Sequence, residues 1–128
     1  MTNHHPPSPP ADVCLLLRAH AEQHWLSQEV VPVLRQLVHR DALPEEQFGA
    51  ALAYLEVLWI EASQRALETD GAYAELQACA ADENPPLHAK ARSYHGAVIR
   101  LREAIARHVM QLLAFPSEEP SGRHASSF

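Results

Sequence analysis

Histidine is the residue in this sequence whose type and spacing offer the most chemistry. Nine of the 128 residues are histidines, and His20 and His24 stand four apart, so both imidazoles lie on one side of a predicted helix. Two imidazoles can share a transition metal such as zinc, provided that a facing helix supplies further ligands. Glu56, Glu61 and His95 are the residues expected to supply them. One of two functional alternatives is therefore a bundle that binds a metal or a small ligand at His20, His24, Glu56 and Glu61.

A second histidine pattern lies on the last of the predicted helices. His88 and His95 are seven residues apart, and Arg102 follows at the next seven-residue step. An exposed histidine among cations is what histidine phosphotransfer requires. The chain lacks the lysine and the small residue that such domains carry at fixed offsets after the histidine. We therefore interpret these residues as a solvated basic flank of a long helix.

Trp25 is the residue that most favours the second functional alternative, which is a protein that binds another protein. If Trp25, Leu26 and Val30 are exposed together, they form an apolar patch suited to a partner helix. If they are not exposed, the same three residues widen the buried stripe of their helix.

The common catalytic motifs do not occur in the chain. There is no Glu-x-x-His of the di-iron bundles, no His-Glu-x-x-His, no Gly-x-Ser-x-Gly and no clustering of the four glycines. The two cysteines, Cys14 and Cys79, are far apart and predict neither a zinc ribbon nor a disulfide framework. The absence of these motifs favours a protein that is not an enzyme, although it does not decide whether the chain is one. The leading functional hypothesis, protein binding, requires no cofactor.

Charge and hydropathy limit the partners that the protein can have. The net charge of −6 and the pI near 5.8 argue against nucleic acid and anionic membranes, both of which reward a basic surface. No leader peptide and no run of 18 apolar residues is evident. We expect a cytoplasmic protein.

The elements that position these residues are predicted to be helices. Alanine and leucine are abundant and strand signals are few, which predicts an all-α fold. The proline-rich residues 1–10 and the polar residues 116–128 are expected to be disordered tails around one helical domain, 11–115.

Three amphipathic stretches fill that domain, and we expect an antiparallel bundle of three long helices. The first, 11–40, carries its apolar stripe through His20 and His24 and is kinked or split near 27–32, where Pro32 lacks an amide hydrogen. The second opens at Pro44 and ends at 69–71, and a short extra helix covers 72–81. The third starts at Asn84 and Pro85. It has the most regular stripe in the chain, which consists of Leu87, Ala91, Tyr94, Val98, Leu101, Ile105, Val109 and Leu112.

The second stretch is strongly acidic and the third is basic. Residues 41–83 hold ten acids against Arg65 alone, whereas residues 85–115 carry five cations against Glu103, so the two stretches are matched neighbours. The leading functional hypothesis is a non-enzymatic adaptor or regulatory module that binds another protein or a second copy of itself.

Overall fold

The computed structural model describes residues 10–39, 43–79 and 85–114, and these ranges are helical almost throughout. The elements are α1 (Ala11–Trp25), the π-helical turn η1 (Leu26–Val30), α2 (Val31–Val38), α3 (Glu45–Ala78) and α4 (Pro85–Ala114). The described ranges contain no strand. The prediction of an all-α fold is confirmed, whereas the expected tails lie outside the described residues, apart from Pro10.

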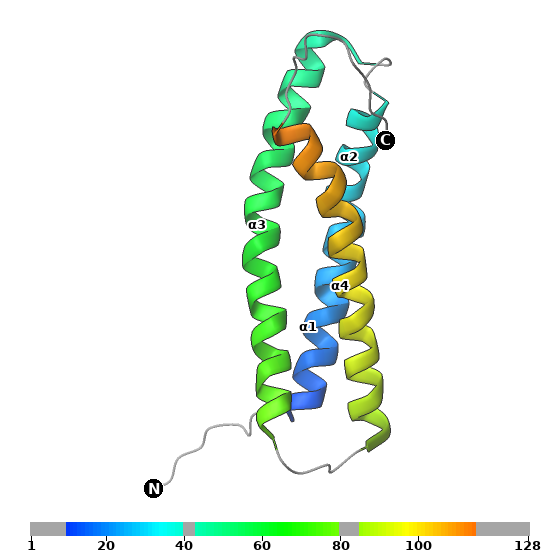
Figure 1. Ribbon diagram of the computed structural model, residues 1–128, viewed down its shortest axis with the longest axis vertical. Coiled ribbons are helices and arrows are strands. Elements are labelled where there is room, and N and C mark those ends of the chain that lie inside the picture. The colour runs from blue at the N-terminus through cyan, green and yellow to red at the C-terminus, as the bar shows by residue number, and fades with distance from the viewer. Residues whose placement is uncertain (1–9, 40–42, 80–84, 115–128) are drawn as a thin grey trace, which may run out of the picture.

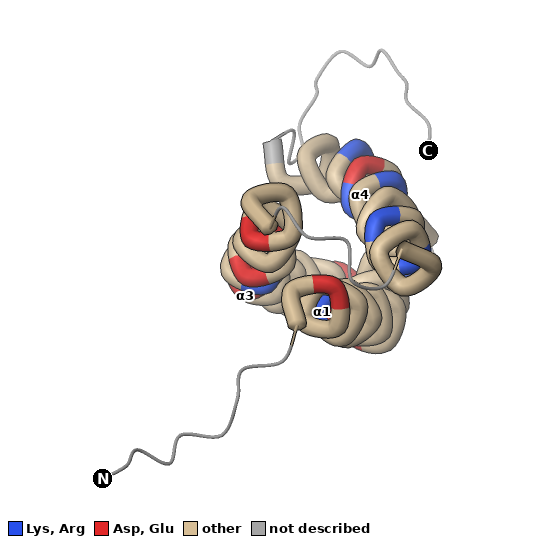
Figure 2. The backbone as a smooth tube through the Cα atoms, turned by 90° about the horizontal axis from the view of Figure 1, so that it is seen from below, with Lys and Arg blue, Asp and Glu red and all other residues tan. Residues whose placement is uncertain are grey.

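The helices form three rods that lie side by side (Figure 1). α1, η1 and α2 follow one another as the first rod, which rises from the lower end of the view. α3 returns to that end and α4 rises again. Seen end-on, α1, α3 and α4 occupy the corners of a triangle (Figure 2). α1 packs against both other rods.

The predicted break in the first rod takes the form of a single wide turn. In η1 the amide of Val31 donates to the carbonyl of Leu26, five residues back. Pro32 has no amide hydrogen, and its ring would clash with a carbonyl four residues back in a regular helix. The wide turn accommodates the proline, and the helical path from Ala11 to Val38 stays continuous.

The same turn keeps four buried residues on one face. Glu22, Leu26, Val30 and Leu34 follow one another at four-residue steps, and all four are buried. In a regular α-helix each step of four overshoots a full turn by about 40°. A π turn holds more residues per turn and takes up this rotation.

α3 does not end where the sequence predicted, and this is a correction. The helix runs through Thr69, Asp70 and Gly71 to Ala78, so the predicted short helix over 72–81 does not exist as a separate element within the described residues. Thr69 donates its hydroxyl to the carbonyl of Arg65, and Thr69, Ala72 and Leu76 are buried against the other rods. This packing outweighs the weak helix propensity of a single glycine.

The starts of α3 and α4 follow the predicted signals. Pro44 immediately precedes α3, and Glu45 and Glu46 place negative charge in its first turn, where the helix dipole is positive. α4 begins at Pro85, which suits the first helical position.

The predicted buried face of the first helix is wrong along α1. The stripe expected through His20 and His24 is exposed at both histidines, and Leu17 is 62% exposed. The residues that face the other rods are instead Asp12, Leu15, Ala19, Glu22, Leu26, Val30, Leu34 and Leu37. Two acids therefore occupy core positions, where they need partners.

The core consists of two apolar clusters. The larger one gathers the upper parts of all three rods: Leu26, Val30, Leu34, Leu37, Leu55, Leu58, Ala62, Ile105, Val109 and Leu112. The smaller one, near the start of α1, holds Leu15, Ala72, Leu76 and Ala91. Charged side chains occupy the level between them.

Candidate functional site

A column of three basic side chains runs down the inner side of α4. It consists of His88, His95 and Arg102, at seven-residue spacing, and we call it the basic column. His88 and His95 are buried, with exposed fractions of 9% and 5%. The interpretation of these residues as a solvated flank is therefore wrong. Each of the three contacts an acid from another helix.

Arg102 joins all three rods. Its Nε and Nη2 donate to the two carboxylate oxygens of Glu22 on α1, at 2.6 and 2.7 Å. Its Nη1 donates to Asp70 on α3, at 3.0 Å to Oδ1 and 3.2 Å to Oδ2. Glu22 is only 2% exposed, so the bidentate ion pair with Arg102 holds a carboxylate that is almost inaccessible to water.

The charges of this cluster shift two pKa values. Burial by itself lowers the pKa of Arg102, but the hydrogen bonds and negative charges of Glu22 and Asp70 outweigh burial and raise that pKa above its ordinary value. For Asp70 the effects have the opposite signs: burial by itself raises the pKa, but the hydrogen bonds with His95 and Arg102 and the positive charges of these residues outweigh burial. The pKa of Asp70 is therefore lowered.

The two histidines of the column are held in similar ways. His95 Nε2 lies 3.0 Å from Asp70 Oδ1, and the ring of Tyr73 stacks on the imidazole with centroids 4.4 Å apart. His88 Nδ1 lies 3.0 Å from Asp12 Oδ2, and both side chains are nearly inaccessible. The arrangement sets each histidine beside an acid of another helix, and it places two imidazoles inside the fold.

The residues of the predicted metal site are not brought together. His20 and His24 share a groove of about 400 Å³ with Trp25 and Arg65, and neither Glu56 nor Glu61 lines it. Across the described parts of the chain, no three His, Cys, Asp or Glu side chains are grouped so that they could hold a metal ion. The groove also contains the Arg65 guanidinium, whose positive charge would repel a cation.

The predicted patch at Trp25 does not form. Leu26 and Val30 are fully buried in the larger apolar cluster, so they are not exposed together with Trp25. Trp25 is half-buried against the same cluster, and the Arg65 guanidinium lies 4.5 Å from the centre of its ring. The three residues widen the buried stripe, which was the other alternative.

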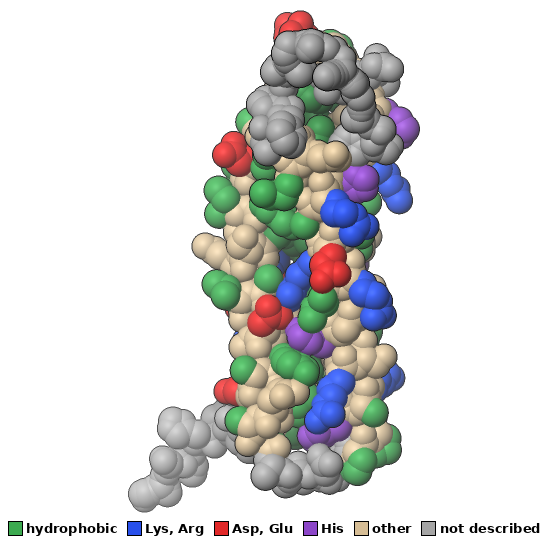
Figure 3. Space-filling model, viewed as in Figure 1, with side chains coloured by type: hydrophobic (Ala, Val, Ile, Leu, Met, Phe, Trp, Pro, Cys, Tyr) green, Lys and Arg blue, Asp and Glu red, His purple; other side chains and the backbone are tan. Residues whose placement is uncertain are grey.

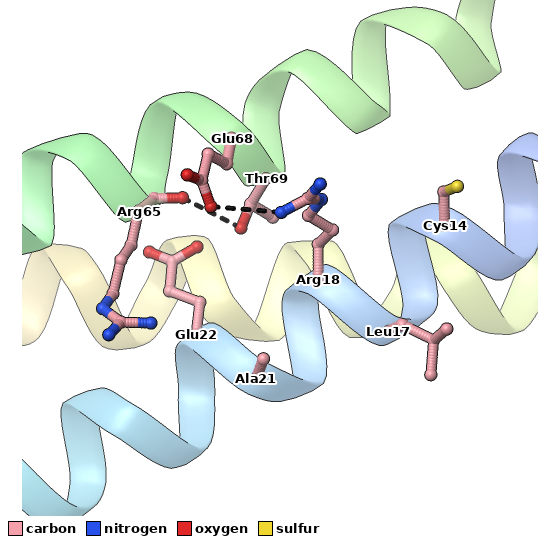
Figure 4. Close-up of a pocket in the computed structure, with 8 residues that line it drawn as sticks. All are labelled: Cys14, Leu17, Arg18, Ala21, Glu22, Arg65, Glu68 and Thr69. Atoms are coloured by element: carbon pink, nitrogen blue, oxygen red, sulfur yellow. Dashed lines mark hydrogen bonds and ion pairs between the residues drawn. The ribbon is translucent and has the colours of Figure 1, made fainter.

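A second groove separates α1 from α3 (Figure 4). Its volume is about 320 Å³, and it is lined by Cys14, Leu17, Arg18, Ala21, Glu22, Arg65, Glu68 and Thr69. Arg18 reaches from α1 to Glu68 on α3, with a donor–acceptor distance of 3.1 Å, so an ion pair crosses the groove.

The outer side of α3 carries a second stripe, apolar except at Gln64, that was not predicted from the sequence. Its positions alternate between steps of three and four residues and are all exposed: Ala50, Ala53, Val57, Ile60, Gln64, Leu67, Gly71, Ala74 and Ala78. We call them the outer stripe. Val57, Ile60 and Leu67 are 59%, 60% and 73% exposed. In Figure 3, apolar side chains project from the α3 edge of the molecule. This is the heptad spacing of helices that pair with another helix.

Acidic side chains border the outer stripe on both sides. Each of them is the chain neighbour of a stripe residue, and we call the set the flanking acids: Glu56, Glu61, Glu68, Asp70 and Glu75. Of the flanking acids, only Asp70 forms ion pairs with the described residues of α4.

No model of a known protein family, no characterised protein and no solved structure matches this chain. Within the described ranges, no helix has the length and hydropathy needed to cross a membrane.

Proposed function

We propose that the chain is a non-enzymatic interaction module of the cytoplasm, an antiparallel bundle of three helices that binds another protein or a second copy of itself. The outer stripe of α3 is the observation that carries the proposal. Val57, Ile60 and Leu67 expose more than half of their surface along one line of the helix. Contiguous exposed apolar surface of this kind marks interaction sites, because leaving it in water is unfavourable.

The spacing of the stripe supports a helix as the binding element. A helix of 34 residues that buries one face against its own chain and, except at Gln64, repeats apolar residues or glycine every seven positions on the opposite face has two packing surfaces. The first rod (α1, η1 and α2) and α4 cover the inner one. The outer one has the pattern of a coiled-coil seam.

The experiment compares the wild type with the double variant Ile60→Asn/Leu67→Asn. Sedimentation velocity at rising protein concentration measures self-association, and affinity purification from cells of the source measures retained partners. We expect the wild type to self-associate or to retain a partner, and the double variant to do neither. Circular dichroism confirms that the variant is folded.

Met110→Asn is the matched control, because Met110 is 55% exposed but lies on α4. It should behave like the wild type. If all three proteins stay monomeric and retain the same set of proteins or none, the outer stripe is not an interaction site.

A further inference from the structure

The flanking acids restrict what can lie on the outer stripe. Three of them, Glu61, Glu68 and Glu75, repeat at seven-residue spacing along one border, and Glu56 and Asp70 lie along the other. In paired helices these are the positions whose charges meet across the seam and select the partner.

A second copy of the same stripe is a poor occupant. In a parallel pair, each border faces the opposite border of the other helix, so Glu56 would meet Glu61 and Asp70 would meet Glu75. In an antiparallel pair each border faces its own kind, and the three repeated glutamates would line up with glutamates. Both orientations bring like charges together, which disfavours pairing.

Asp70 is held by His95 and Arg102, but the four glutamates among the flanking acids are available to a partner. Glu61 pairs with Arg65 one turn away, and Glu68 pairs with Arg18 across the α1–α3 groove, but all four side chains are at least one-third exposed. Exposed pairs of this kind are weak and exchange readily. Glu56 and Glu75 have no ion pair with any residue that the structure describes. α3 as a whole holds seven acids and one arginine.

We propose that the outer stripe of α3 binds an amphipathic helix of another protein, whose apolar seam is bordered by lysine or arginine. This inference rests on the proposed function and adds the chemistry of the partner. The apolar residues supply the contact area, and the basic borders neutralise the flanking acids, which a second copy cannot do through this surface.

Three synthetic peptides of about four heptads test the proposal. The first has Ile and Leu at the seam and Lys on both borders, the second has Glu on the borders, and the third is a scramble of the first with the same composition. Fluorescence anisotropy of each labelled peptide gives its Kd. We expect the first to bind at least about 10-fold more tightly than either of the others, and to weaken as salt rises.

Two protein variants make the test specific. Ile60→Asn/Leu67→Asn should weaken binding of the first peptide at least about 10-fold, whereas Met110→Asn should leave its Kd within about 2-fold. The triple variant Glu61→Lys/Glu68→Lys/Glu75→Lys should reverse the preference and select the peptide with glutamate borders. Folding of each variant is checked by circular dichroism.

The outcomes separate this inference from the proposed function. Equal binding of the first peptide and its scramble, or no loss of binding in the double variant, overturns the inference. A wild type that self-associates, loses self-association in the double variant and shows no preference among the peptides keeps the proposed function and overturns the basic partner. A wild type that neither self-associates, nor retains a partner, nor binds the first peptide overturns both.

Discussion

Arg102→Met should be among the most destabilising single substitutions in the chain. Glu22 is 2% exposed and accepts two hydrogen bonds from Arg102, at 2.6 and 2.7 Å. Methionine fills most of the space of arginine but leaves that carboxylate buried without its partner, which costs about 3–5 kcal/mol. Asp70 adds little to this loss, because its side chain is 51% exposed and water can replace the arginine. Urea denaturation followed by circular dichroism measures the free energy of unfolding.

Two further variants show whether the pair itself is responsible. Glu22→Leu/Arg102→Met removes both charges and should be about as stable as the wild type or more stable, because well-packed apolar side chains replace buried ion pairs without loss. Arg18→Met is the matched control. Its pair with Glu68 is also short, at 3.1 Å, but the two side chains are 55% and 61% exposed, so the cost should stay below about 1 kcal/mol. The reasoning is refuted if Arg102→Met costs no more than Arg18→Met, or if the double variant loses as much as the single one.

Three other predictions concern α3. Gly71→Ala should raise the free energy of unfolding by about 0.5–1 kcal/mol, because Gly71 is helical and an added Cβ would meet nothing within 4 Å; a loss in urea denaturation would contradict this. Leu55→Ala should cost about 2–5 kcal/mol and Leu67→Ala under about 0.5 kcal/mol, since their exposed fractions are 0% and 73%; equal effects on thermal melting would show that the assigned faces are wrong. The pKa of Asp70 is lowered in the fold, so its contribution to stability is present above the ordinary value of about 3.9 and is lost as pH falls through the folded-state value. As the pH falls below about 5, the wild type should therefore lose more unfolding free energy than Asp70→Asn, and parallel losses in urea titrations would count against this assignment.

Helix content and the starts of α3 and α4 were predictable, because these depend on local signals. Pro44 and Pro85 mark helix starts, and the α4 stripe from Ala91 to Leu112 is regular enough to identify the buried face. Gly71 shows where such signals fail, since buried neighbours farther along the helix decided whether it continued.

The buried face of α1 was not predictable from the apolar pattern alone. Leu15, Leu16 and Leu17 are consecutive, so apolar side chains point in three directions and no single face stands out. The face that is buried contains Asp12 and Glu22, which can be buried only because α4 supplies His88 and Arg102. The seven-residue spacing of the basic column was visible in the sequence. The sequence of a single helix does not show, however, which acids of other helices its side chains will contact.

The outer stripe was missed for a related reason. Ending α3 at Gly71 removes Ala74 and Ala78 from the pattern and leaves too few heptads to notice. With the helix extended to Ala78, the repeat spans four heptads, and the acids beside it become a border instead of a loose acidic stretch.

The ion pairs of the basic column also fix the axial register of α4 against α1. Alanine, valine and leucine follow each other on both helices, so apolar contacts alone would tolerate sliding α4 by one heptad, about 10 Å. Sliding it one way would put Val109 opposite Glu22 and strand a buried carboxylate. Sliding it the other way would carry Arg102 toward the apolar cluster around Leu26. Only the observed alignment places the Arg102 guanidinium at Glu22, and for that reason a chain so rich in small apolar residues can hold its rods at a single level.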